Sequence, residues 1–241
     1  MDRVYKLIKN NQIELKGTKK VEVPYFSNQM LNNSKSVLIV GEHFGGIEGV
    51  SETVKELGFT DVTTTDIMAQ RKGSWLNTKT DWKHIQCDFI EFDESNKYDF
   101  IISISVFEHF GFWFAGGRMA NGLAKDDSCQ WNHDLAGITK ACKLLKDDQS
   151  KLIITLPAGP YMNYEETGEP FLRYYDGLRQ QLIRNTAVAE GCFVTNEKYY
   201  YSSDVENWQE VGAEINDPKY YSHYGPFTPN VIWGLTIQKN I

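Results

Sequence analysis

A glycine-containing segment and a later acidic residue have the types and spacing of a nucleotide-binding site. Residues 41–46 read GEHFGG after a short apolar run, and Asp66 ends the next β-branched run. A glycine loop between a strand and a helix turns sharply and offers backbone N–H groups at the positive end of the helix dipole. An acidic residue after the second strand accepts hydrogen bonds from a ribose diol. The alternative is an ordinary strand–helix turn, with Asp66 as a helix N-cap.

The spacing of the glycines discriminates between classes of ligand. A dinucleotide fingerprint that begins at Gly41 needs glycines at positions 41, 43 and 46, and His43 occupies the second of these. Because the second glycine lets a pyrophosphate approach the backbone, a side chain there argues against NAD or FAD. A ligand without a pyrophosphate tolerates it better. A nicotinamide-dependent oxidoreductase nevertheless stays as an alternative function.

Three further residues could perform acid–base chemistry. Glu108 and His109 follow the most apolar run of the chain, and ligands of open α/β sheets bind at the carboxyl ends of strands. The ordinary pKa of histidine, ~6.5, suits a base that deprotonates an alcohol, so His109 is the first candidate and His133 the second. Glu108 would orient His109 or bind acceptor hydroxyls.

Each of these residues also has an alternative role. His109 could hydrogen-bond a loop backbone, His133 could lie in the first turn of a helix, and Glu108 could be a buried structural carboxylate. Together the three could instead gather a divalent metal, but no local ligand spacing indicates such a site, and we predict none.

A sheet that gathers strand ends is needed to bring these residues together. Apolar or β-branched runs predict seven strands, which lie at 36–40, 62–65, 85–90, 98–105, 151–156, 193–201 and 231–238. Helical spacing of apolar residues predicts helices that start near positions 46, 135 and 171. The alternation predicts an α/β fold: a single doubly wound, seven-stranded, mostly parallel sheet with helices on both faces. The last strand is expected to be antiparallel, because no helix separates it from the strand before it.

The run VLIVGEHFG at 37–45 resembles the first motif of class I (Rossmann-like) S-adenosylmethionine (SAM)-dependent methyltransferases, V-L-(D/E)-x-G-x-G-x-G. Gly41 and Gly45 match its first and third glycines, whereas Ile39 and His43 depart from it. The run SISVFEH at 103–109 resembles the motif that ends the fourth strand in many small-molecule members. The resemblance implies a ribose contact for Asp66 and an adenine contact for Asp88. The cofactor-binding residues that it implies are Gly41, Glu42, Gly45, Asp66, Ile67, Asp88, Phe89, Ser103 and Ser105.

The letters EHFG and the Gly-rich insertion after 108–111 are similar to uncharacterised methyltransferases found with sugar and surface-polysaccharide genes. This narrower resemblance implies O-methylation of a small polar acceptor: a hydroxyl of a sugar, a sugar nucleotide or a related surface-glycan precursor. The substrate-binding candidates are Trp113, Arg118, Trp131, Tyr161, Asn163 and Arg173. For Arg173, a surface salt bridge is the alternative. Since Ile39 and His43 weaken the cofactor motif, a catalytically inactive SAM-fold subunit that binds a partner is also an alternative.

The length of 241 residues is consistent with one methyltransferase domain, 1–241, that carries some additional segments. Residues 1–35 form a lead-in of helix and loop, and 111–134 and 202–229 are insertions on the acceptor side. The first insertion is longer than ordinary loops and is rich in aromatic and glycine residues, which is typical of a lid. The second is rich in tyrosine, which suits sugar rings, an edge strand or a homodimer interface.

Composition excludes several classes of function. The net charge is −7 and the sequence has no basic run, which argues against a nucleic-acid partner. No apolar run reaches the ~20 residues of a membrane span, and the polar N-terminus does not resemble a signal peptide. The four cysteines form no C-x-x-C pair. We therefore expect a cytoplasmic protein whose partner is a small molecule.

Overall fold

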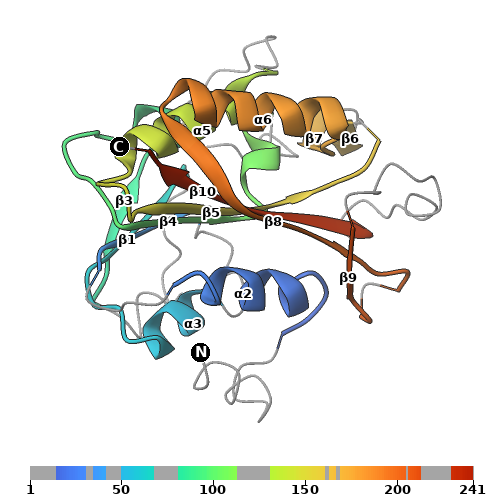
Figure 1. Cartoon of the computed structure of the whole chain (residues 1–241), viewed down its shortest axis with the longest axis horizontal. Helices are drawn as coiled ribbons and strands as arrows, with labels where there is room; N and C mark the ends of the chain where they lie inside the picture. The colour runs from blue at the N-terminus through green and yellow to red at the C-terminus, as the bar shows by residue number, and fades with distance from the viewer. Residues whose placement is uncertain are drawn as a thin grey trace.

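The computed structural model describes residues 15–30, 35–41, 50–67, 81–112, 131–160, 163–166, 169–204, 206–212 and 229–240. A central sheet separates two layers of helices (Figure 1). Helices α5 (His133–Leu144) and α6 (Gly177–Ala189) cover one face, and α2 (Lys19–Ser27) and α3 (Val50–Glu56) cover the other. This arrangement confirms the predicted α/β fold with helices on both faces.

The main sheet has eight strands in the order β3-β2-β1-β4-β5-β10-β8-β9. Strands β1 to β5 are parallel, and β10 runs antiparallel between β5 and β8. The strands are β1 (Val37–Val40), β2 (Val62–Asp66), β3 (Lys83–Gln86), β4 (Phe100–Ile104), β5 (Lys151–Pro157), β8 (Cys192–Tyr201), β9 (Gln209–Val211) and β10 (Val231–Lys239). The expected antiparallel last strand is confirmed.

The strand count differs from the prediction of seven because β9 extends the edge of the sheet. Its three residues pair antiparallel with β8 and lie inside the predicted insertion 202–229. A strand of three half-exposed or exposed residues buries no alternating apolar face, so it leaves no periodic signal in the sequence.

The apolar runs in the sequence result from burial on both faces of the sheet. All four residues of β1 are buried. Leu38 and Val40 pack into the core under α5 and α6, whereas Val37 and Ile39 pack into the core under α2 and α3. Alternate side chains of a strand point to opposite faces, so a strand covered on both sides must be apolar throughout.

The helix predicted to start near Phe171 begins six residues later, at Gly177. Phe171 lies instead in β7 (Glu169–Arg173), which pairs with β6 (Asn163–Glu166) as a separate hairpin. Tyr175 then donates its backbone N–H to the carbonyl of Pro157 at 2.9 Å, which holds this residue against the end of β5. The helix starts only where Asp176 caps it, by accepting a bond from the backbone N–H of Arg179 at 2.8 Å.

The predicted third strand, 85–90, is also shorter in the structure. Strand β3 ends at Gln86, and the short helix η1 (Phe89–Glu91) follows. Asp88 caps that helix, because its carboxylate accepts from the backbone N–H of Ile90 at 2.9 Å. An aspartate in this position ends a strand and starts a turn.

The lead-in segment contributes to the core. Val23 and Phe26 of α2 are completely buried beneath the sheet, and the hydroxyl of Tyr25 lies 3.0 Å from that of Thr236 in β10. Helix α2 therefore packs against β10 as well as against the first strands of the sheet. The sequence analysis predicted only a lead-in of helix and loop here.

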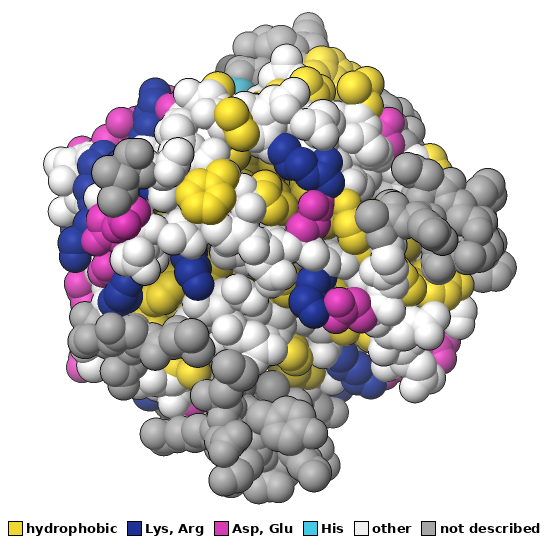
Figure 2. All heavy atoms as spheres, in the orientation of Figure 1, with side chains coloured by type: hydrophobic (Ala, Val, Ile, Leu, Met, Phe, Trp, Pro, Cys, Tyr) yellow, Lys and Arg dark blue, Asp and Glu magenta, His cyan; other side chains and the backbone are white. Residues whose placement is uncertain are grey.

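Charged side chains of both signs are interspersed on the face shown in Figure 2. Lys and Arg atoms lie beside Asp and Glu atoms and do not form one basic patch on that face. Within the described part of the chain, no helix is long and apolar enough to cross a membrane.

Candidate functional site

The order of the strands reverses direction between β1 and β4, and this point defines the candidate site. From β1 the chain continues to β2 on one side, while β4 pairs with β1 on the other. In open α/β sheets, ligands bind outside the carboxyl ends of the strands at such a switch point. Gly41 follows β1, Asp66 ends β2, and Ser105 follows β4. The structure thus brings three of the predicted cofactor-binding residues to one edge.

Gly41 makes the turn at this edge and is held tightly there. Its φ is +87°, and its backbone N–H donates to the carbonyl of Thr65 at 2.8 Å. A Cβ atom at this position would lie 2.4 Å from Val106, which follows β4. Both the backbone conformation and the contact therefore require glycine, independently of any ligand.

Gly41→Ala is expected to lower the free energy of unfolding by about 2–4 kcal/mol, the sum of a left-handed alanine and an overpacked contact. Chemical denaturation measures the loss. Gly191→Ala is the matched control, because Gly191 has φ +71° but no atom within 4 Å of the added Cβ. If both variants lose the same free energy of unfolding, the contact with Val106 adds nothing to the cost of the left-handed backbone.

The acidic residues predicted to bind the nucleoside lie at neighbouring strand ends. Asp66 is half-buried at the end of β2, and its carbonyl accepts from the N–H of Cys87 at 3.0 Å. The carbonyl of Ile67 accepts from the side chain of Gln86 at 3.3 Å. Asp88 caps η1, which is the alternative role that the sequence left open. Phe89 is buried against Phe107, with ring centroids 5.9 Å apart, so its side chain cannot stack on a ligand.

The two serines near the end of β4 differ in their surroundings. Ser103 is buried, and within the described residues its hydroxyl has no hydrogen-bond partner. Ser105 has φ +53°, the only positive value at a non-glycine residue among the described residues. Its hydroxyl donates to the carboxylate of Glu22 in α2. A non-glycine residue in this conformation is costly and often lies at a functional site.

Glu108 and His109 lie on the short helix η2 (Phe107–His109) that follows. Glu108 is only 3% exposed, and within the described residues one of its carboxyl oxygens has no hydrogen-bond partner. The pKa of Glu108 is raised to about 8, mainly by burial and also by the nearby charge of Glu22, whereas a backbone hydrogen bond, Lys19 and Arg173 lower it. Glu108 is therefore a protonated acid at neutral pH, able to donate a hydrogen bond. His109 is half-buried beside it.

Arg173 fixes the position of this short helix. Its guanidinium donates to the carbonyl of Phe107 at 3.2 Å and to that of Phe110 at 2.7 Å. The same group lies over the ring of Phe112 at 4.1 Å and 3.6 Å from the carboxylate of Asp134. Arg173 is completely buried. Burial rules out the predicted surface salt bridge, whereas the acceptor contact stays a prediction.

Asp134 connects the same region to α6. Its carboxylate forms an ion pair with Arg179 as well as with Arg173, and Arg179 also donates to the carbonyl of Trp131 at 2.6 Å. His133 is the first residue of α5, which is the alternative role considered for it. Trp131 is 46% exposed and packs edge-on against Phe112, with centroids 5.7 Å apart.

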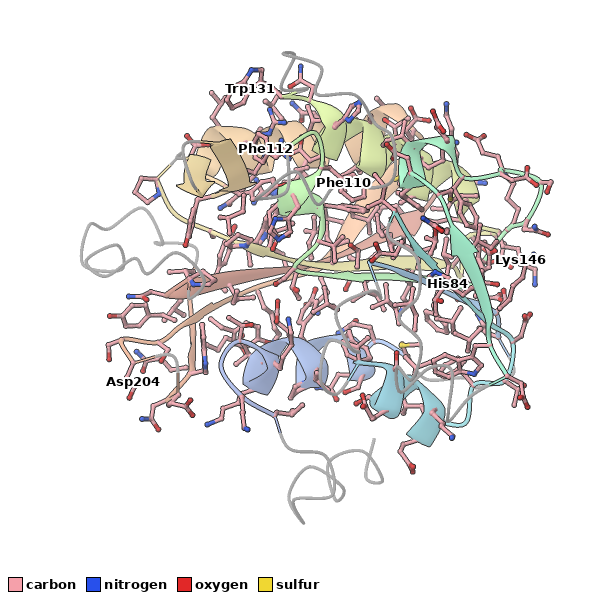
Figure 3. All side chains as sticks on the ribbon, turned by 180° about the vertical axis from the view of Figure 1, so that it is seen from behind. His84, Phe110, Phe112, Trp131, Lys146 and Asp204 are labelled. Carbon is pink, nitrogen blue, oxygen red and sulfur yellow. The ribbon has the colours of Figure 1, made fainter. Side chains whose placement is uncertain are left out.

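The aromatic side chains of this region continue from the core to the surface. Phe110, Phe112 and Trp131 lie on the α5–α6 side of the sheet, with Trp131 outermost (Figure 3). Phe110 packs on Phe107 with ring centroids 4.7 Å apart, so the series begins beside Glu108. The described ends of the predicted lid, 111–112 and 131–134, therefore meet at an aromatic contact.

Several predicted site residues cannot be placed. Those outside the described residues are Glu42, Gly45, Trp113, Arg118 and Tyr161. Asn163 lies in β6, but its side chain is outside the description. Within the described ranges, no group of three or more His, Cys, Asp or Glu side chains could hold a metal ion. The sequence analysis missed the bond between Glu22 and Ser105, and it missed the bonds from Arg173 to the backbone carbonyls beside η2.

Solved structures show which fold this is. The structure of the 1,6-didemethyltoxoflavin-N1-methyltransferase of Burkholderia thailandensis, with 1,6-didemethyltoxoflavin and S-adenosylhomocysteine bound, has a TM-score of 0.57 to this chain. The two share 11% identity, over 98% of this chain and 85% of that one. The chain has the fold of class I SAM-dependent methyltransferases.

Two further structures with the methyltransferase fold support the same conclusion. An S-adenosylmethionine-dependent methyltransferase of Clostridium acetobutylicum has a TM-score of 0.54 and 9% identity, over 98% of this chain and 97% of that one. A TehB-like SAM-dependent methyltransferase of Corynebacterium glutamicum has a TM-score of 0.53 and 13% identity, over 98% and 94%. No family model and no curated protein matches the sequence.

Proposed function

We propose that this chain is a SAM-dependent methyltransferase that acts on a small polar acceptor. One observation carries the proposal: Gly41, Asp66 and Ser105 meet at the switch point of a sheet with the methyltransferase strand order. The similar structure from Burkholderia thailandensis, which holds S-adenosylhomocysteine, supports the choice of cofactor.

The residues at the edge of the sheet fit such a cofactor. The chain turns at Gly41 directly after β1, and Asp66 lies at the end of the neighbouring strand, where its carboxylate would accept from a ribose diol. The backbone after Asp88 lies at the next strand end and would contact the adenine. When bound, the cofactor supplies an activated methyl group, and the protein holds the acceptor in line with it.

For the acceptor we propose a hydroxyl of a sugar, a sugar nucleotide or a related surface-glycan precursor, which would place the enzyme in polysaccharide biosynthesis in the cytoplasm. In O-methylation the acceptor oxygen takes the methyl group and loses its proton. The imidazole of His109 would accept that proton. The protonated Glu108 beside it would donate a hydrogen bond to the acceptor. The exposed ring of Trp131 suits a sugar face. The interspersed charges in Figure 2 favour a small acceptor over nucleic acid.

Asp66→Ala is expected to weaken binding of S-adenosylhomocysteine roughly 10- to 100-fold, since charged hydrogen bonds contribute about 1.5–3 kcal/mol. Isothermal titration calorimetry measures the change. Asp93→Ala is the control, because Asp93 is exposed and its carboxylate accepts bonds from nearby Ser95. It is expected to bind like the unaltered protein.

The same titration separates the competing functions. A folded, unaltered protein that binds no S-adenosylhomocysteine at millimolar concentration contradicts the proposal. If its melting temperature then rises with NAD(H), the nicotinamide-dependent oxidoreductase is favoured. Binding without methyl transfer to any acceptor in a crude pool would favour the inactive SAM-fold subunit.

A further inference from the structure

Glu22 is a completely buried carboxylate on α2 that bonds to the ends of the central strands. The hydroxyl of Ser105 donates to one of its oxygens, and that of Thr155 in β5 donates to the same oxygen at 2.6 Å. Its other oxygen accepts from Thr18 at 2.8 Å and from the ammonium of Lys19. One carboxylate therefore joins a helix, the residue after β4 and a residue of β5.

These contacts exceed what anchoring the helix would require. Val23 and Phe26 are already buried beneath the sheet, and Tyr25 bonds to Thr236. A buried charge is expensive, and an apolar side chain of similar size is often an equal or better anchor. Although burial raises the pKa of Glu22, the charge of Lys19 and the bonds from Lys19, Ser105 and Thr155 outweigh it and hold that pKa below its ordinary value.

The bonds converge on the residue with the left-handed backbone. The N–H of Ser105 donates to the carbonyl of Thr155 at 3.1 Å, and both hydroxyls reach the same oxygen of Glu22. Ser105 is thus held at two points, its N–H and its hydroxyl, just where the chain leaves β4 for η2. Val106, against which Gly41 packs, is the next residue.

The charge of Glu22 also reaches the following turn. Among the described residues, Lys19 of α2 and Arg173 of β7 are the charged groups that lower the pKa of Glu108, whereas Glu22 raises it. The charge of Glu108 also acts on Tyr175, but burial raises the pKa of the Tyr175 hydroxyl well above its ordinary value, so this group stays neutral. Among these groups Glu22 is the one that disfavours a second negative charge on this turn.

We infer that Glu22 is a positioning residue of the methyl-transfer site, which fixes the end of β4 and keeps the turn with Glu108 and His109 in place. The inference rests on the proposed function, because it assigns the turn to that site. It adds α2, from the predicted lead-in, to the machinery of the cofactor edge.

Glu22→Gln tests this inference, because glutamine keeps the shape and one acceptor oxygen but removes the charge. We expect the pKa of Glu108, followed by ¹³C NMR of its carboxyl, to fall, because the charge of Glu22 raises it. We also expect any pH-dependent step in the S-adenosylhomocysteine dissociation constant to move to lower pH by the same amount. Glu206→Gln is the matched control, because Glu206 is exposed and pairs with Lys20, which lies on α2 like Glu22. In this control, neither the pKa of Glu108 nor the pH dependence of the dissociation constant should change.

The outcomes distinguish this inference from the proposed function. An unchanged pKa of Glu108 in Glu22→Gln overturns the inference, whatever the ligand result, and loss of stability alone would assign Glu22 a purely structural role. Absence of S-adenosylhomocysteine binding by the unaltered protein overturns the proposed function instead.

A second variant keeps the inference testable if Glu22→Gln does not fold. Ser105→Ala removes one of the bonds to Glu22 and leaves both carboxyls in place. It is expected to weaken S-adenosylhomocysteine binding about fivefold, which corresponds to the ~1 kcal/mol of one hydrogen bond. Unchanged affinity overturns the inference. If both variants fold, their effects on affinity should be less than additive when combined, because both alter the contact between Ser105 and Glu22.

Discussion

Glu108→Gln is expected to raise the free energy of unfolding at pH 8–9 by roughly 3–5 kcal/mol relative to the unaltered protein, and by much less at pH 4–5. The reason is the burial of Glu108, which raises the pKa of this carboxyl to about 8 in the folded state. Below its ordinary value of 4.5 both the folded and the unfolded chain hold the proton. Glutamine has the same shape and no proton to lose.

The sign follows from the protons bound in each state. Between pH 4.5 and about 8 the folded protein keeps a proton that the unfolded chain has released. The free energy of unfolding of the unaltered protein therefore falls as the pH rises through this window, by up to about 1.4 kcal/mol per pH unit from this group. Above pH 8 both states are ionised and the difference between the variant and the unaltered protein becomes constant.

Urea denaturation at pH 4.5, 6, 7.5 and 9 measures the effect as the difference between the two proteins, so that other titrating groups cancel. Glu91→Gln, at an exposed position on the neighbouring η1, is the control and should give a small, constant difference. A difference for Glu108→Gln that stays flat from pH 4.5 to 9 would show that this carboxyl is ionised in the folded protein at neutral pH.

The second large effect is expected at Arg173. Arg173→Met should lower the free energy of unfolding by about 3–5 kcal/mol, the usual loss when one partner of a buried ion pair is removed. Methionine fills much of the volume but leaves the carbonyls of Phe107 and Phe110 without their donor. Since these carbonyls flank η2, weaker binding of S-adenosylhomocysteine should accompany the loss of stability.

Arg184→Met is the matched control for this variant. Arg184 also pairs with a carboxylate, Glu197, and lies over the ring of Trp233, but it is partly exposed. Exposed pairs contribute about 1 kcal/mol or less. Arg173→Lys should fall between the two, because an ammonium cannot span both carbonyls with a planar fork. An equal loss of unfolding free energy in Arg173→Met and Arg184→Met would mean that the bonds from Arg173 to the carbonyls beside η2 add no stability.

The predictable parts of the fold are those in which local sequence and burial agree. Strands β1, β4 and β5 are mostly apolar because both of their faces are covered, so their presence follows from short runs alone. Gly41 was also predictable, since a strand that ends in glycine before a helix marks a tight turn. The strand order then fixes which strand ends meet.

What could not be predicted depends on contacts between distant residues. Arg173 bonds to carbonyls 63 and 66 positions earlier, and Glu22 bonds to Thr155 across 133 positions. Neither residue carries a local pattern that distinguishes it from a surface charge. One weak signal was present for Glu22: it lies between Val21 and Val23, in a helix whose neighbouring residues are apolar. The sequence likewise placed Phe171 in a helix because its spacing from Tyr175 happens to match a helical turn.

The position of α2 has a consequence for how this protein is divided. The resemblance to methyltransferase motifs begins at about residue 36, and a fragment cut there would retain every motif. It would nevertheless leave one side of β1 and β4 without Val23 and Phe26, and the hydroxyls of Ser105 and Thr155 without their common acceptor. The smallest autonomous unit of this protein is therefore longer than its recognisable signature and includes α2.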